Sequence, residues 1–166
     1  GRALLQLGEN DSVAIYTEKA RELCKSLPYN SGMVDVDLLH GIYQTGKGGD
    51  SMHSGIQELQ QVTRQGTATN RAKAYHQLAQ TYLKCGQNTL AEIMLDSMYS
   101  LLKQSDSHIY IQADYKPIIN HYLQNSNLQK VGLYTEMMLN EQQTLKEKKL
   151  NFNLVEAITD FHTRQQ

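Results

Sequence analysis

A glycine-rich segment with one lysine is the first stretch whose residue types could do chemistry. The pattern Gly41-x4-Gly46-Lys47 falls one residue short of a phosphate-binding loop, because Gly48 stands where a serine or threonine hydroxyl would bind magnesium. Such a loop follows a buried strand, whereas the residues before this segment have helical spacing and end at Tyr43. We therefore interpret the segment as a flexible turn between two helices.

Histidines and cysteines are the other residues that could bind metals or catalyse reactions. The six histidines include no i, i+4 pair and no HExxH motif, so they do not predict a metal site. Cys24 and Cys85 are too few and too far apart for a zinc site or a disulfide framework, and we expect both thiols to pack as small apolar side chains. No carboxylate pair, Ser-His-Asp or Cys-His grouping stands at a spacing that defines a catalytic site. The sequence thus predicts no catalytic residue, no metal site and no cofactor, and we expect a protein that is not an enzyme.

Length and composition indicate a folded helical protein. The 166 residues suffice for one domain with a sizeable core, and 40% hydrophobic residues with a net charge of −1 exclude a disordered segment. Near neutrality argues against direct nucleic-acid binding, which needs a basic face. Two prolines and little β-branched alternation predict an all-α fold. The sequence has no apolar run of about 18 residues, so we expect no membrane span in this stretch.

The helices that must position any binding residues are clearest between Ala72 and Lys103. Gly86 divides this stretch and can end the first helix in a left-handed conformation, after which Asn88 or Thr89 is placed to cap the second helix. Apolar residues at helical intervals form a stripe on the first helix: Tyr75, Leu78, Ala79 and Tyr82. A second stripe follows on the next helix: Ala91, Leu95, Met98 and Leu101. The small alanines in these stripes would let the paired helices approach closely.

This order of residues resembles the tetratricopeptide repeat (TPR), a helix–turn–helix unit of about 34 residues. The resemblance implies a right-handed superhelix of antiparallel helix pairs. We expect the repeats to occupy residues 1–135, and a long C-terminal helix at residues 136–166 to cap them or link them to a following domain. Within the first region we expect a partial unit at 3–28 and further units at about 33–64, 72–103 and 112–140.

The flanking units are predicted from weaker versions of the same pattern. We expect the chain to start partway through a helix, as a piece of a longer protein would. Residues 3–7 should end that helix at Gly8, with a polar turn at 9–12 after it. The next helix should stop before Pro28, with an apolar stripe formed by Tyr16, Ala20, Leu23, Cys24 and Leu27. The second unit has the stripe Val36, Leu39, His40 and Tyr43, a turn at 45–50, and then Met52, Ile56, Leu59 and Val62. The third has Tyr115, Ile118, Ile119 and Tyr122, and then Val131 and Met138.

Three positions in these units raise specific questions. Ser126 stands where Gly86 ends the first helix of the central unit. Pro117 would interrupt a helix that includes Tyr115, so this helix is either kinked or starts near Asp114. The imidazole of His40 occupies a stripe position and must find a hydrogen-bond partner if it is buried. A structural role is the simpler interpretation of this histidine, and a functional role stays open.

Ligand-binding residues follow from the family resemblance. In stacked repeats of this family the first helix of each unit lines a concave groove, and residues off its packing stripe contact ligands. On the central unit these would be Lys73, His76, Gln77, Gln80 and Lys84, and on the next unit Lys116, Asn120 and Gln124. Such a groove would be polar and mildly basic, which suits an extended peptide or an acidic end group. The Lys116 and Asn120 pair resembles half of the carboxylate clamp of chaperone-binding repeats, and ordinary solvated helix faces are the alternative.

The C-terminal region has its own sparse apolar pattern. Leu150, Leu154, Ile158 and Phe161 follow at intervals of four, four and three residues. This spacing is compatible with a short coiled-coil seam through which the chain would form a homodimer. The alternative is a helix that caps the open end of the repeats.

Three features carry a closer resemblance: Asn-Asp-Ser before Tyr16 and Ala20, the run Leu95-Asp96-Ser97-Met98, and the long terminal helix. With these features the chain as a whole resembles the sensory repeat regions of bacterial signalling proteins, notably of the Bacteroides group. The resemblance implies a protein or peptide ligand, a periplasmic location, and an output through a kinase or a helix-turn-helix domain elsewhere in the protein. One alternative is the cytoplasmic, peptide-pheromone-binding half of a transcription regulator. Another is a constitutive structural scaffold.

Overall fold

The computed structural model describes residues 10–25, 31–105 and 109–165. Within these ranges the chain forms helices and no strand, so the predicted all-α class is confirmed. The helices are α2 (Asn10–Lys25), α3 (Ser31–Lys47), α4 (Gly49–Gln65), α5 (Ala68–Lys84), α6 (Asn88–Gln104), α7 (Lys116–Gln124) and α8 (Leu128–Gln165). They belong to two compact units, Gly1–Ile111 and Gln112–Gln166.

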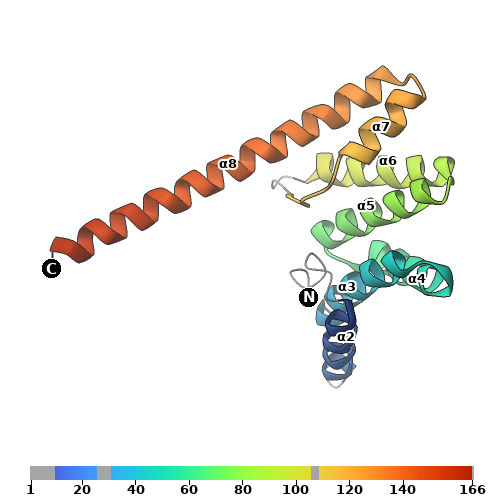
Figure 1. Cartoon of the computed structure of the whole chain (residues 1–166), viewed down its shortest axis with the longest axis horizontal. Helices are drawn as coiled ribbons and strands as arrows, with labels where there is room; N and C mark the ends of the chain where they lie inside the picture. Colours follow the sequence, from blue (N-terminus) through green and yellow to red (C-terminus); the bar gives the residue numbers. More distant parts are fainter. Residues whose placement is uncertain (1–9, 26–30, 106–108, 166) are drawn as a thin grey trace. The chain divides into compact units, whose positions relative to one another are not determined.

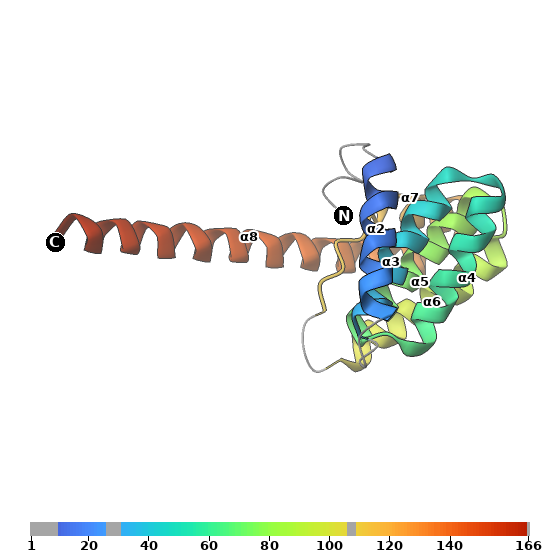
Figure 2. The ribbon, with the colours of Figure 1, turned by 90° about the horizontal axis from the view of Figure 1, so that it is seen from below.

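The first unit is a series of helices that pack on their neighbours in sequence order (Figure 1 and Figure 2). The most extensive contacts are those of α3 with α4 and of α5 with α6, and α4 on α5 joins these two hairpins. Its core contains residues from four helices: Leu38, Leu59, Val62, Ala74, Leu78, Tyr82 and Ala91. Each hairpin thus buries one apolar face against the other, and neither face is complete alone.

The central hairpin has most of the predicted core. Its fully buried apolar residues include Leu78, Ala79, Ala91, Leu95 and Met98, all at 0% exposure, and Tyr82 is 7% exposed. The ends of the two predicted stripes, Tyr75 and Leu101, are only half-buried. The helical spacing of the apolar residues therefore predicted the middle of the buried face of this hairpin correctly.

The turn between α5 and α6 has the backbone conformation predicted for Gly86. This glycine has a φ of 74°. Its N–H donates to the Leu83 carbonyl, and the Gln87 N–H donates to the Tyr82 carbonyl, which is the paired bonding of a Schellman motif. The prediction that Asn88 or Thr89 caps α6 is wrong, because the capping position is Gln87 and α6 begins at Asn88. This motif reverses the chain so tightly that α6 begins directly after Gln87.

The turn between α3 and α4 differs from the prediction. Helix α3 continues through Lys47 and α4 begins at Gly49, so Gly48 alone separates them, and the expected turn at 45–50 is wrong. Gly48 and Gly49 have φ values of 76° and 59°, which reverse the chain within two residues. Gly41, Gly46 and Lys47 all lie on α3, so the phosphate-loop pattern is not a loop at all.

Two glycines allow α3 and α4 to approach each other closely. A Cβ on Gly55 would lie 2.8 Å from the Gly41 carbonyl oxygen and 2.8 Å from the Thr45 amide nitrogen. A Cβ on Gly41 would lie 2.8 Å from Cγ of Leu59. The role that the small alanines have in the central hairpin is therefore taken here by glycines.

This contact changes the register predicted for α3. Val36 and Tyr43 are buried as the stripe predicts, but Leu39 and His40 are only half-buried. Leu38, at 3% exposure, is the residue of α3 in the main core. The predicted buried face of α3 was chosen from its apolar residues. In the structure, α3 and α4 meet at Gly41 and Gly55, because two helices can approach closely only where no side chain separates them.

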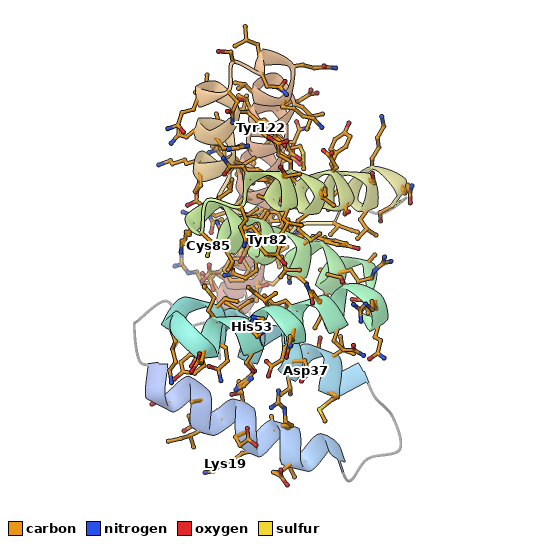
Figure 3. The ribbon with its side chains drawn as sticks, turned by 90° about the vertical axis from the view of Figure 1, so that its right-hand side faces the viewer. Lys19, Asp37, His53, Tyr82, Cys85 and Tyr122 are labelled. Atoms are coloured by element: carbon orange, nitrogen blue, oxygen red, sulfur yellow. The ribbon has the colours of Figure 1, made fainter. Side chains whose placement is uncertain are left out.

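Helix α2 packs on α3 through a face that differs from the predicted one. The predicted turn at 9–12 is wrong from Asn10 onward, because α2 begins there. Tyr16 and Leu23 are 59% and 68% exposed, so they do not form the expected buried stripe, whereas Thr17 is buried at 5%. Figure 3 shows Lys19 on the side of α2 that points away from the other helices. The predictions for residues 3–8, Leu27, Pro28 and the Cys24 side chain lie outside what the structure describes.

The second unit consists of α7 and α8. Helix α7 begins at Lys116, so Pro117 occupies the first turn, where its missing N–H removes no helical hydrogen bond. Of the two alternatives, the start near Asp114 is confirmed. Ser126 has a φ of 56° and donates its N–H to the Leu123 carbonyl, which repeats the bonding of the α5–α6 turn.

The core of the second unit is small. The rings of Tyr122 and Tyr134 stack with centroids 5.7 Å apart and planes 6° apart. Ile118, four residues before Tyr122 on α7, is fully buried. The predicted Val131 and Met138 are half-buried. Helix α8 continues well beyond α7 (Figure 1) and includes the predicted C-terminal helix from residue 136, but begins earlier, at Leu128.

Candidate functional site

The candidate site in the first unit lies on the side formed by α3 and α5. These two helices contact each other, whereas α4 and α6 form no comparable contact within the described residues. The Gln77 side-chain amide on α5 donates to the Thr45 hydroxyl on α3 at 3.1 Å. The first helices of the two hairpins therefore present a common surface.

The predicted ligand residues of α5 form one row on this helix. Lys73, His76, Gln77 and Gln80 are half-buried, and Lys84 is exposed. Their spacing of three and four residues places them on one side of the helix. Helical rise places the two lysines about 16 Å apart, with amide groups between them. The row therefore combines two cationic ends with a hydrogen-bonding middle.

The predicted ligand residues of α7 belong to the second unit. Lys116, Asn120 and Gln124 are all exposed, and they follow one another at one-turn intervals along α7. They form a short polar row of their own. The structure brings together the residues within each row. The row on α5 belongs to the first unit, and the row on α7 belongs to the second unit.

A cluster of charged residues joins α2, α3 and α4. The Arg21 guanidinium of α2 donates to Asp37 Oδ1 at 3.0 Å and to Glu58 Oε1 at 3.3 Å. His40 Nδ1 lies 2.7 Å from Glu58 Oε2. Figure 3 shows Asp37 on the part of α3 that faces α2. One arginine and one glutamate thereby connect three helices through half-buried side chains.

The hydrogen bonds of His40 define its orientation. Its Nδ1 faces the Glu58 carboxylate, and its Nε2 lies 3.2 Å from the Gln44 amide nitrogen. Because a carboxylate only accepts hydrogen bonds, His40 Nδ1–H donates to Glu58, while Nε2 faces the Gln44 side chain. The half-buried His40 thus has the hydrogen-bond partners that the sequence analysis required of it, and these contacts favour its structural role.

Arg21 remains charged within this cluster. Burial alone would lower the pKa of Arg21, but the hydrogen bond to Asp37 and the charges of Glu58 and Asp37 outweigh burial and raise the pKa. A raised pKa for a basic group means that its stabilising contribution is complete below the unfolded-state value and is lost only in strong alkali. The ion pairs of Arg21 thus persist across the neutral pH range.

The sequence contained part of the information needed to find this cluster. Asp37, His40 and Gln44 follow at intervals of three and four residues, so they form a polar stripe on α3 that could have been recognised. Arg21 and Glu58 lie on other helices, and their pairing depends on how those helices pack. Of these residues, only His40 stands out in the sequence, because it occupies a position of the apolar stripe.

Thiol chemistry, metal binding and membrane insertion are the other possibilities to compare with the described residues. Cys85 is a free, exposed thiol, so the prediction that it packs as a buried apolar side chain is wrong (Figure 3). Across residues 10–25, 31–105 and 109–165, no group of three His, Cys, Asp or Glu side chains is placed to hold a metal ion. No helix in the same ranges combines the length and apolar character of a membrane span.

Comparison with protein-family models, with curated protein sequences and with solved structures finds no match to this chain.

Proposed function

We propose that this chain is a non-catalytic binding module that recognises an extended peptide segment of another protein. In this proposal the hairpins α3–α4 and α5–α6 stack as tetratricopeptide-like repeats in a right-handed superhelix, with α3 and α5 on the concave side. The module would be the sensory part of a larger bacterial signalling protein. The observation that carries the proposal is the polar row from Lys73 to Lys84 on the side where α3 and α5 meet.

The row has the chemistry that an extended peptide requires. Lysine ammonium groups attract carboxylates, and the amides of Gln77 and Gln80 can donate to and accept from a peptide backbone. The separation of about 16 Å between Lys73 and Lys84 corresponds to about five residues of extended chain. We therefore expect a ligand with acidic groups about five residues apart, such as a side chain and a terminal carboxylate.

Peptide selection tests the groove on α5. A random peptide library is selected on the immobilised chain, and an enriched peptide is titrated by calorimetry against the wild type and against Lys73→Glu and Lys84→Glu. Each reversal should weaken binding about tenfold or more, because a charge-assisted hydrogen bond becomes a repulsion. Lys103→Glu, at an exposed position on α6, is the matched control and should leave affinity unchanged.

Two outcomes of this titration count against the proposal. If the library yields no acidic peptide, the row on α5 is an ordinary solvated face. If Lys103→Glu weakens binding as much as Lys73→Glu, attraction is due to overall charge and not to a groove.

The row on α7 is tested with the same peptide. The double variant Lys116→Ala/Asn120→Ala removes the pair that resembles half of a carboxylate clamp. A loss of affinity would add α7 to the binding surface. Unchanged affinity would restrict the surface to the first unit and remove Lys116, Asn120 and Gln124 from it.

A further inference from the structure

The distal part of α8 exposes its apolar side chains. Every residue from 145 to 165 is exposed. Leu150 is 68% exposed, Leu154 is 57% exposed and Phe161 is 60% exposed. An isolated helix is only marginally stable in water, because most helical stability in proteins comes from packing an apolar face. This part of α8 would therefore gain stability from a partner surface.

Four of these residues form a continuous seam. Leu150, Leu154, Ala157 and Phe161 follow at intervals of four, three and four residues, which is the spacing by which paired helices interlock. Ile158 adjoins the seam and widens it. A single small residue, Ala157, leaves room for a larger side chain on the helix that covers it. Leu145 and Phe152 lie on another side of α8 and take no part in this seam.

The two ends of the seam have opposite charges. Glu147 lies one heptad before Leu154, and Arg164 lies one heptad after Ala157. Both side chains therefore point along the same edge of the helix as the apolar residues. Whatever covers the seam must also accommodate one negative and one positive group about 25 Å apart.

A second copy of α8 satisfies this requirement in only one direction. In a parallel pair Glu147 would face its own counterpart, and so would Arg164, which places like charges together at both ends. In an antiparallel pair centred between Leu154 and Ala157, each Glu147 faces Arg164 of the second copy. The same register places Leu154 against the small Ala157 and Phe161 against Leu150.

We propose that the distal part of α8 is an interaction surface for a second copy of this chain and that the two helices pair antiparallel in this register. The twofold symmetry uses each contact twice, so the pair contains two Glu147–Arg164 contacts. One antiparallel alignment of the two helices both pairs Glu147 with Arg164 and places the large Leu154 against the small Ala157. The pairing goes beyond the proposed peptide binding and does not depend on it.

Charge reversal distinguishes the two directions. In sedimentation velocity of the full chain over a concentration series, Glu147→Arg should raise the dimer dissociation constant about tenfold, because two attractive contacts become repulsive. The double variant Glu147→Arg/Arg164→Glu should restore the wild-type dissociation constant. Glu156→Arg makes the same charge change off the seam and should have no effect. Leu154→Glu, in the centre, should leave the chain monomeric.

Several results would overturn the proposal. In a parallel pair, residue 147 and residue 164 each face their own counterpart, so like charges stay together in Glu147→Arg and in the double variant. Dissociation constants that are unchanged in both variants therefore exclude the antiparallel register. A wild-type chain that is monomeric throughout the concentration series, or a trimer or larger species, excludes the twofold pair. Circular dichroism of Glu156→Arg, which should keep the pair, checks that a charge change at an exposed position does not itself disturb α8.

Discussion

Gly55→Ala tests whether the contact between α3 and α4 depends on missing side chains. The added Cβ would lie 2.8 Å from the Gly41 carbonyl oxygen, 2.8 Å from the Thr45 amide nitrogen and 2.9 Å from the Gln44 Cβ. Two of these three neighbours are backbone atoms, which cannot rotate away as a flexible side chain could. The two helices must therefore separate, and their other contacts must loosen with them.

The expected effect is a difference between two opposing terms. Overpacking of a close contact costs about 1–3 kcal/mol. Alanine in place of glycine within a helix gains up to about 1 kcal/mol. With the full gain, the free energy of unfolding of the hairpin should therefore fall by up to about 2 kcal/mol. Gly46→Ala is the control, because a Cβ on Gly46 of α3 meets nothing within 4 Å and should be neutral or stabilising.

Hydrogen exchange measured by mass spectrometry is the appropriate assay, because it reports on α3 and α4 separately from α8. Amides of α3 and α4 should exchange faster in Gly55→Ala and at the wild-type rate or slower in Gly46→Ala. Urea unfolding followed by circular dichroism provides the corresponding free energies. If the two alanine variants are equally stable, glycine at position 55 is not required for helix approach, and our account of the α3 register is wrong.

Two further predictions concern the charged cluster and the turns. Glu58→Gln should lower the free energy of unfolding by about 1–2 kcal/mol, because it removes a charge that Arg21 and His40 share; Glu18→Gln, 3.9 Å from the same arginine but 58% exposed, should change it by less than about 0.5 kcal/mol in the same urea unfolding assay. Ser126→Gly should raise the melting temperature of the second unit, because glycine adopts the positive φ of this turn without the strain of about 1 kcal/mol that a side chain adds. Equal stability of the two glutamate variants, or a lower melting temperature for Ser126→Gly, would contradict these predictions.

The central hairpin shows where sequence reasoning succeeded. Its residues agree at each level, since the apolar stripe, the small residues and Gly86 all specify the same pair of helices. Gly86 adopts the predicted left-handed conformation, and Ser126 repeats it in the second unit. Such features are local, because they depend on residues within a few positions of one another.

Helices α2 and α3 show where it failed. The apolar stripe placed Tyr16 and Leu23 in a core, yet both are exposed, and α2 instead contacts α3 beside the Arg21 ion pairs. On α3 the pattern favoured Leu39 over Leu38, although Leu38 is the residue in the core. Periodicity shows that a helix has an apolar side, but the neighbouring helix decides which side is covered.

The sequence by itself determined the helical class, the central hairpin and the left-handed turn at Gly86, and it limited the helix around Pro117 to two alternatives. Each of these follows from side-chain spacing and from the backbone preferences of glycine and proline, which act over one or two turns. Only the tertiary structure decided the register of α3 and the grouping of Arg21, Asp37, His40 and Glu58. Those depend on contacts between residues up to 37 positions apart, where the closest approach of two helices, and not the local pattern, selects the partners.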